Sequence, residues 1–528
     1  MRQLRELDVP GVDTIWRQLF PGKVANLFSR PASSATHHFP KFASSTIHQN
    51  GTALAFTESF AVYGNGLTPA QMKWVIDTQY VKGLTLAVFS NYPLSTRDHL
   101  MTGCRPAFGA PDPLWDFMPD LHRYVARLGY VLSCGQPEIE IGLYYPVRDL
   151  WASGDAADPA LCGHDRLAQE LLQRQCDFDV IDDDVLGDPS TVVEQGRLAI
   201  GPMRYRTILL GPTERMTPAA ARRLDAFRAA GGQVVRVENF DRVEASLAGV
   251  KPTVGLEPRA AGLRTLVRRW PGGGAAFVFN EGATSYRGTL SVPLEGTLRE
   301  IEPATGLVRA VGASVSEKCR TVPVTLAPWQ TMLLVSGSAD APIASPALRK
   351  VLRSVDLADG WTARVDRQYV AGEHDFEIQA TPQAAFKPAA LGRWAEKLSL
   401  GRDFSGHVTY RRTVAVPASM TGGRLLLDLG AVEYAARVSI DGHRIGSVLW
   451  SPWQIELPPL GNRSEFVLEI EVSNTLANEL TSQRVRDAWA KRSGLGWPSP
   501  YHEMSLGFER DSRGGGLVGP VRLQLATP

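Results

Sequence analysis

The sequence predicts a multidomain protein in which parallel-sheet α/β units are followed by all-β domains. Three observations support this. The chain has 528 residues, too many for one hydrophobic core. Its first part alternates strand and helix signals. After about residue 246 the signals are short strands separated by turns.

The first unit, residues 1–136, alternates buried strands with helices. A strand over 53–57 ends at Glu58, a helix opens at Thr68 and Pro69, and a strand over 83–89 precedes a helix over 114–132. Near-continuous apolar strands between helices predict parallel strands covered by helices. A complete eightfold barrel needs about 250 residues, so only part of one is expected here.

The second unit, residues 137–245, has the pattern of a doubly wound sheet. The expected strands are 139–145, 178–181, 206–210 and 233–237, with helices over 165–176 and 217–230. No GxGxxG follows its first strand and no GxxxxGK[ST] occurs, which counts against a nucleotide site. Residues 272–274 are three glycines before a strand, and we expect a hairpin turn there.

Two β domains follow, at residues 246–345 and 346–528. In the first, short strands with turns between them predict a sandwich. A stretch rich in serine, proline and alanine over 336–346 predicts a linker. The expected strands are 275–279, 288–292, 309–311, 322–326 and 331–335, then 406–416, 424–429, 436–440 and 465–472.

Composition and charge exclude several classes of partner. A net charge of +1 gives no basic field for nucleic acid or an anionic membrane. No apolar run is long enough to predict a membrane span. Residues 1–14 have no secretory pattern, so we expect no leader there, and the compartment stays open. The five cysteines have no zinc or redox spacing and are expected to be free, mostly buried thiols.

Glu58 is the strongest candidate for a catalytic group. It lies where a parallel strand ends, and barrel enzymes place their catalytic residues at the carboxyl ends of strands. Sugar hydrolysis needs a pair of carboxyl groups, and an apolar surrounding tunes the pKa of one of them. The alternative is a structural glutamate that pairs with a loop arginine.

Other candidates for sugar binding lie in loops. Residues 42–51 are expected to form a polar loop near the top of the sheet, where Ser45 and His48 bind sugar hydroxyls. Tyr63 follows Glu58 in the chain, and Asn91 and Tyr92 follow the next strand. Polar and aromatic side chains together suit the hydroxyl edge and the apolar face of a sugar.

No metal site is predicted. His37 and His38 are adjacent, so their side chains diverge if they lie on a strand. Residues 182–184 are three aspartates after a strand of the second unit, and we expect a solvated loop there.

Several motifs in the first unit resemble the latter part of the catalytic barrel of family-106 glycoside hydrolases, the α-L-rhamnosidases. The following order of units is also similar, with a flavodoxin-like unit and then β-sandwiches. The final part is similar to the sugar-binding jelly roll of family-2 glycoside hydrolases. The motifs are residues 9–13, 39–51, 57–64, 67–69, 72–77 and 81–83, and in the final part 404–412, 427–433, 438–442 and 515–522.

The resemblance implies a fold and an activity. The expected fold is a partial (β/α)8 barrel, a flavodoxin-like α/β domain, a β-sandwich and a C-terminal jelly-roll β-sandwich. The implied activity is inverting hydrolysis of terminal α-L-rhamnosyl linkages, with Glu58 matching one of two catalytic glutamates. The partner glutamate lies upstream of these motifs in the family. Calcium near the family's active site is also implied, although the sequence does not place its ligands.

Three hypotheses follow for this chain. It is a rhamnosidase-type hydrolase that lacks one catalytic carboxylate because of N-terminal truncation, a non-catalytic carbohydrate-binding protein, or one half of a split enzyme. In all three the partner is a carbohydrate.

Overall fold

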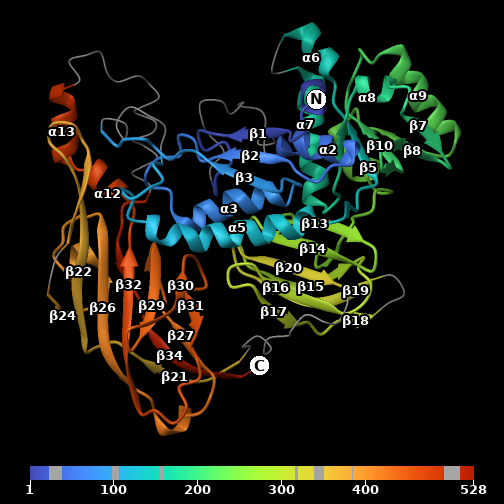
Figure 1. Cartoon of the computed structure of the whole chain (residues 1–528). Coiled ribbons are helices and arrows are strands. Elements are labelled where there is room, and N and C mark those ends of the chain that lie inside the picture. The colour runs from blue at the N-terminus through green and yellow to red at the C-terminus, as the bar shows by residue number, and fades with distance from the viewer. Residues whose placement is uncertain are drawn as a thin grey trace.

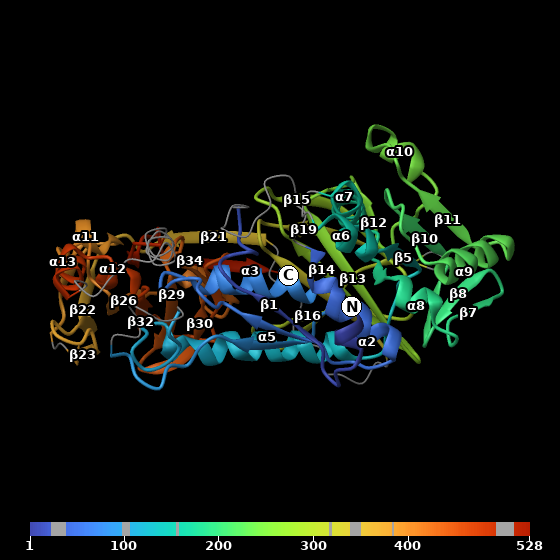
Figure 2. The ribbon, with the colours of Figure 1, turned by 90° about the horizontal axis from the view of Figure 1, so that it is seen from above.

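A computed structural model describes residues 1–22, 38–97, 106–154, 158–315, 319–337, 350–382, 385–492 and 512–527. The molecule is elongated (Figure 2), with the C-terminal β-sheets at one end and an α/β unit at the other. Helix α5 (Met118–Ser133) runs along the middle, below the first sheet (Figure 1). No helix in the described part of the chain is both long and apolar enough to cross a bilayer.

The first sheet has three parallel strands, β1 (Gly11–Thr14), β2 (Phe56–Ser59) and β3 (Leu86–Phe89), in that order. Helix α2 (Pro40–Asn50) connects β1 to β2, and α3 (Pro69–Tyr80) connects β2 to β3. A parallel sheet with helical crossovers agrees with the sequence prediction. The sheet does not close into a barrel within the described residues.

Local chemistry explains where α3 begins. Thr68 caps it by accepting a hydrogen bond from the backbone of Gln71, whose side chain bonds back to the backbone of Thr68. Pro69 occupies the first turn, where its missing N–H costs nothing. The predicted start of this helix is therefore correct.

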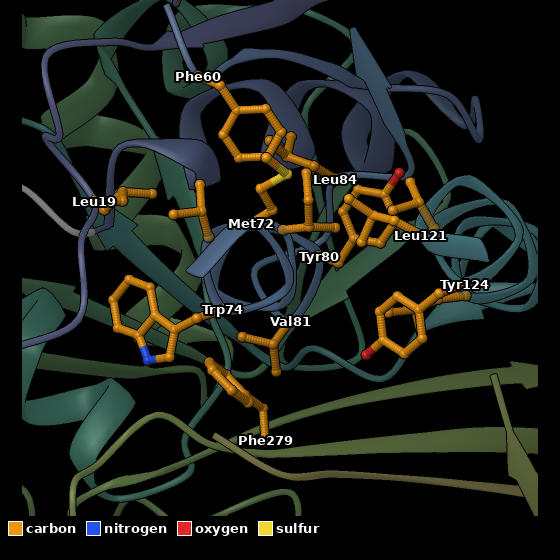
Figure 3. Packing of buried hydrophobic residues seen from close by; sticks show 14 of the residues in the cluster. Leu19, Phe60, Met72, Trp74, Tyr80, Val81, Leu84, Leu121, Tyr124 and Phe279 are labelled. Carbon is orange, nitrogen blue, oxygen red and sulfur yellow. The ribbon is translucent and has the colours of Figure 1, made fainter. Parts of the chain in front are cut away.

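The main hydrophobic core surrounds α3, which is covered on both sides (Figure 3). Met72 lies toward Phe60 and Leu84, on the side of the first sheet. Trp74 packs against Phe279 of the β-sandwich, with ring centroids 6.2 Å apart. Because this one core contains residues of α3 and of the sandwich sheet together, the first unit and the sandwich are packed as one body.

The second α/β unit has an all-parallel sheet in the order β11-β10-β5-β6, which is 2-1-3-4 along the chain and is the order in which flavodoxin-like sheets begin. A small antiparallel sheet of β7, β8 and β9 precedes β10. The elements are α1 (Arg2–Arg5), β5 (Ile141–Tyr144), α6 (Val147–Ser153), α7 (Pro159–Gln173), β6 (Asp179–Ile181), α8 (Asp183–Gly187), β7 (Val192–Glu194), β8 (Arg197–Ile200), β9 (Met203–Tyr205), β10 (Thr207–Leu210), α9 (Pro218–Ala229), β11 (Gln233–Arg236) and α10 (Val243–Ser246).

Two antiparallel sheets form the sandwich, in the orders β12-β15-β19-β18 and β17-β16-β20-β14-β13-β4. The chain enters it directly after α5, because β4 pairs with β13 before the second α/β unit begins. The predicted hairpin is correct, since Gly272 at φ +78° joins β13 to β14. The strands are β4 (Gln136–Pro137), β12 (Gly255–Glu257), β13 (Leu263–Trp270), β14 (Gly273–Asn280), β15 (Tyr286–Val292), β16 (Leu298–Glu302), β17 (Leu307–Ala310), β18 (Ser314–Val315), β19 (Arg320–Leu326) and β20 (Thr331–Ser336).

The C-terminal part contains a four-stranded sheet, β21-β34-β27-β31, and a larger sheet with the path β23-β22-β26-β32-β29-β30. The strands are β21 (Lys350–Asp356), β22 (Trp361–Ala371), β23 (Ile378–Pro382), β24 (Lys387–Ala389), β25 (Gly392–Arg393), β26 (Gly406–Ala415), β27 (Leu425–Asp428), β28 (Val432–Glu433), β29 (Ala435–Ile440), β30 (His443–Val448), β31 (Gln454–Glu456), β32 (Glu465–Ser473), β33 (Gly516–Leu517) and β34 (Arg522–Thr527). Short helices α11 (Trp394–Lys397), α12 (Ala477–Leu480) and α13 (Gln483–Arg492) complete it.

Two sequence predictions about residues outside the candidate site are wrong, one on the aspartates at 182–184 and one on the burial of the cysteines. Residues 182–184 do not form a solvated loop, because Asp182 and Asp183 are buried at the start of α8. Asp182 forms an ion pair with Arg5, and Asp183 accepts a hydrogen bond from the Tyr144 hydroxyl. The described cysteines are free, but only Cys176 is buried. His37 and most of the predicted linker lie outside the described residues.

Candidate active site on the open face of the first sheet

The register of the first sheet places two carboxylates side by side. Asp13 of β1, Glu58 of β2 and Val88 of β3 are neighbours across the strands, so their side chains share one face. The fold leaves this face open, since the Val88 side chain is 54% exposed and Leu86, two residues earlier on the same strand, is 40% exposed. Sequence reasoning missed Asp13 because a four-residue strand gives almost no periodic signal.

The opposite face of the same sheet is buried by polar contacts with α3. The Thr14 and Thr57 hydroxyls each donate to Gln79 Oε1 over 2.5 Å. Gln79 Nε2 donates to the Ser59 hydroxyl over 3.0 Å. Because side chains alternate along a strand, these contacts direct Asp13 and Glu58 away from α3.

Glu58 is half-buried and carries no stabilising partner in the described part of the chain. Its carboxylate forms no hydrogen bond or ion pair with any described residue. A structural glutamate paired with a loop arginine is therefore not what the described residues show. The nearest acidic neighbour along the sheet is Asp13, a group of like charge.

The turns that follow β1 and β2 hold a strained backbone. Trp16 and Arg17 have φ near +55°, and Phe60 and Val62 have φ of +79° and +60°. Such angles are costly for residues other than glycine, most of all for a β-branched one. The turns are joined by a hydrogen bond from Trp16 N to Ala61 O. Strain retained in this way is typical of functional edges of a fold.

Asn91 and Tyr92 follow β3 at the same carboxyl edge of the sheet. The side-chain oxygen of Asn91 is buried and has no hydrogen-bond partner among the described residues, an arrangement that calls for an explanation. Tyr92 is 69% exposed, and its ring centroid lies 5.8 Å from that of Trp115. An amide oxygen without a partner among the described residues and a pair of aromatic rings, both at this edge of the sheet, suit a sugar.

The structure places Tyr63 in the core rather than in a binding loop. It is fully buried, and its hydroxyl donates to Leu19 O over 2.8 Å. Burial raises the pKa of this hydroxyl well above its ordinary value. Its ring packs edge-on against Phe60, so Tyr63 supports the strained turn from beneath.

Ser45 and His48 are also placed differently from the prediction. Residues 40–50 form α2 rather than a loop, and both side chains are buried against the second α/β unit. The Ser45 hydroxyl accepts a hydrogen bond from Val180 N, and His48 Nδ1 lies 2.8 Å from Asp179 Oδ1. Burial lowers the pKa of His48 despite this carboxylate. Both residues connect the two α/β units.

An apolar groove lies along the outer edge of β3. Its volume is about 580 Å³, and its lining includes Leu54, Leu86, Phe89, Val125 and Tyr130. Strand β3 has no partner on this side among the described strands. An unpaired strand edge beside an apolar groove is a place where further chain can pair.

The described residues do not offer a donor set for the calcium implied by the resemblance. Calcium takes six to eight oxygen ligands from carboxylates, carbonyl groups and water. Asp13 and Glu58 supply two carboxylates on the open face. Within the described residues, the one group of three metal-binding side chains contains two histidines and one aspartate, a set that does not fit calcium.

A comparison with known proteins finds a solved structure with a similar fold. No protein-family model and no curated protein sequence matches the chain. A rhamnosidase from Novosphingobium sp. PP1Y is similar in structure, with a TM-score of 0.71 and 20% identity over 98% of this chain. That alignment covers 51% of the rhamnosidase, so this chain spans about half its length.

Two β-galactosidases align less well. One from Bacillus circulans sp. alkalophilus has a TM-score of 0.41 and 13% identity over 64% of this chain and 61% of that chain. Gan42B, a GH42 enzyme, has a TM-score of 0.42 and 12% identity over 64% and 60%. Neither supports an argument about function. At 20% identity the likeness to the rhamnosidase shows a shared fold alone.

Proposed function

We propose that this chain is part of a glycoside hydrolase of the α-L-rhamnosidase type, with Glu58 as a catalytic carboxyl group. The observation that carries the proposal is the open-face position of Glu58, where no described residue pairs with its carboxylate. A half-buried carboxylate without a partner does not stabilise the fold, and we therefore infer that Glu58 acts on a bound ligand. The fold relative is itself a rhamnosidase, which agrees with the family resemblance of the motifs.

The sugar lies across the carboxyl edge of the sheet in this proposal. Asn91 supplies a hydrogen-bond acceptor, and Tyr92 with Trp115 supplies an apolar surface for the ring of the sugar. Tyr63, Ser45 and His48 act in the scaffold rather than on the sugar.

We further propose that the second carboxyl group is supplied by polypeptide beyond this chain, because the carboxyl group that the register of the described strands places beside Glu58 is that of Asp13. An inverting hydrolase needs about 6.5–9.5 Å between its two carboxyl groups to admit a water. Asp13 and Glu58 are neighbours on adjacent strands with backbones about 4.8 Å apart, so we infer that this pair is more closely spaced than the two carboxyl groups of an inverting hydrolase. The apolar groove beside β3 is where the chain that carries the missing group pairs with the sheet. The polypeptide that carries the missing carboxyl group can belong to the same longer chain or to a separate partner chain, and the proposal is the same for both.

Sugar binding by the chain alone tests the proposal. Saturation-transfer NMR with L-rhamnose should give a signal that weakens in Tyr92→Ala. The matched control is Tyr130→Ala, because the Tyr130 side chain on α5 is 74% exposed, about as much as that of Tyr92 at 69%. Equal signals from the wild type and both variants would place the sugar elsewhere. When the chain is produced with the polypeptide that completes the sheet, turnover should be lost in Glu58→Gln and kept in Glu465→Gln.

A further inference from the structure

Three potential metal ligands meet between α2 and α7, away from the open face. His38 lies two residues before the start of α2, and His164 and Asp165 lie on α7. One ligand atom from each lies within 4.8 Å of the others, and all three side chains are buried. Their exposed fractions are 3%, 0% and 5%.

The hydrogen bonding of His164 leaves one nitrogen available as a ligand. Its Nδ1 lies 3.0 Å from Tyr144 O, and because a carbonyl only accepts, Nδ1 carries the proton. In the neutral ring the lone pair is then on Nε2, which is buried and has no hydrogen-bond partner among the described residues. A backbone carbonyl that fixes the tautomer in this way is the usual second partner of a metal-bound histidine.

The spacing of the group fits a small divalent ion after a modest adjustment. His38 Nε2 and Asp165 Oδ1 are 3.7 Å apart. Ligands about 2.0–2.1 Å from a tetrahedral zinc ion are roughly 3.3 Å from one another. Side-chain rotation closes a difference of this size without moving either helix. Two imidazoles and one carboxylate suit zinc and similar first-row ions rather than calcium or magnesium.

We propose that His38, His164 and Asp165 form a binding site for a divalent first-row transition ion such as Zn²⁺. The ion connects the start of α2, which leads into the strand of Glu58, to α7 of the second α/β unit. Because the three ligands are buried, we infer that the ion holds the two units together rather than meeting a substrate. The inference is independent of the proposed function.

Metal titration of the full chain tests this site. After treatment with a chelator, the wild type should bind one Zn²⁺ per chain. Its melting temperature should rise by about 3 °C or more at a hundredfold excess over the Kd. Co²⁺ should give visible absorption bands stronger than those of the hydrated ion. Binding should weaken about 100-fold in His164→Gln and in Asp165→Asn.

The control variant is His122→Gln, since His122 is exposed on α5, lies against Phe89 and does not belong to the described group of metal-binding side chains. It should bind Zn²⁺ like the wild type. X-ray absorption of the zinc-loaded wild type should show a shell at about 2.0–2.1 Å with scattering from two imidazoles, and this result does not depend on any variant folding. Failure of the folded wild type to bind one ion would overturn the proposal. Binding unchanged in His164→Gln would show an adventitious ion only.

Discussion

Replacing Glu58 by glutamine should stabilise the first sheet slightly. Glu58 and Asp13 are like charges on adjacent strands, about 4.8 Å apart at the backbone. Two charges at that backbone separation would repel by at most about 1 kcal/mol in a water-like dielectric, and since salt and side-chain freedom weaken the repulsion we expect a gain of about 0.5–1 kcal/mol. The Glu58→Gln change removes this repulsion and breaks no contact with the described residues.

Hydrogen exchange of the strand amides measures the effect where it occurs. A multidomain chain does not unfold in one step, so a global unfolding free energy would not report on this sheet. A gain of about 0.5–1 kcal/mol slows exchange through local opening about two- to fivefold in peptides that contain β2. Asp13→Asn should have a similar effect, and the double variant should gain less than the sum of the two.

The opposite result would refute the reasoning about Glu58. A structural glutamate bound to a cation would lose a charged hydrogen bond, worth about 1.5–3 kcal/mol, on conversion to glutamine. Exchange in β2 would then accelerate more than tenfold. A further check is salt, because the stabilisation in Glu58→Gln should shrink in 1 M NaCl if repulsion is its cause.

Three further predictions concern stability. Val88→Thr on the open face should cost less than about 0.5 kcal/mol, whereas Val75→Thr in the fully buried core should cost about 1–3 kcal/mol. Equal costs, measured by hydrogen exchange in peptides that contain β3 and α3, would mean that the face is covered. Asp77→Ala should lower the stability by about 3–5 kcal/mol, because it leaves the buried Lys73 ammonium without its carboxylate and the Tyr124 hydroxyl without its acceptor. Adding Lys73→Met should restore part of this stability, and a double variant whose loss equals the sum of the two single losses would contradict the prediction. Burial raises the pKa of Asp112 to about 7, so the folded chain binds a proton more tightly than the unfolded chain and its stability falls as the pH rises from about 4 to 7. The melting temperature of Asp112→Asn should therefore exceed that of the wild type at pH 8, and by less at pH 5. An equal difference in melting temperature at both pH values would disprove the shift.

The elements that the sequence predicted correctly are those with local signals. Helix α3 has its cap, its proline and its capping box within four residues, so its start needs no tertiary information. The position of Glu58 near the end of a parallel strand followed from the apolar run before it. The hairpin at Gly272 followed from its glycines.

The elements that were missed depend on partners distant in the chain. Helix α2 is polar along its length, and its burial depends on groups of β6 such as Asp179 and the backbone of Val180. Strand β13 contains Arg268, which is buried because it donates to the carbonyls of Cys134 and Gly135. No spacing rule on a single sequence reveals such pairings.

The residues of the candidate site also fall into those that local sequence signals predict and those that only the fold brings together. Asn91 and Tyr92 were predicted because polar and aromatic residues follow a strand; the structure places them at the edge of the sheet, and their role in sugar binding stays a prediction. Asp13 became visible only through the register of β1 with β2. The group that contains His38 and His164 also required the fold, since the two residues belong to different units.

The most direct test of the account is hydrolysis of p-nitrophenyl α-L-rhamnopyranoside by the folded 528-residue chain. Glu58→Gln and Glu465→Gln, an exposed glutamate at the start of β32, would be measured beside it. Because we propose that this chain supplies only one of the two carboxyl groups, we expect no turnover above background from any of the three proteins. Turnover by the wild type and Glu465→Gln that is lost in Glu58→Gln would contradict it, since the chain would then hold a complete site.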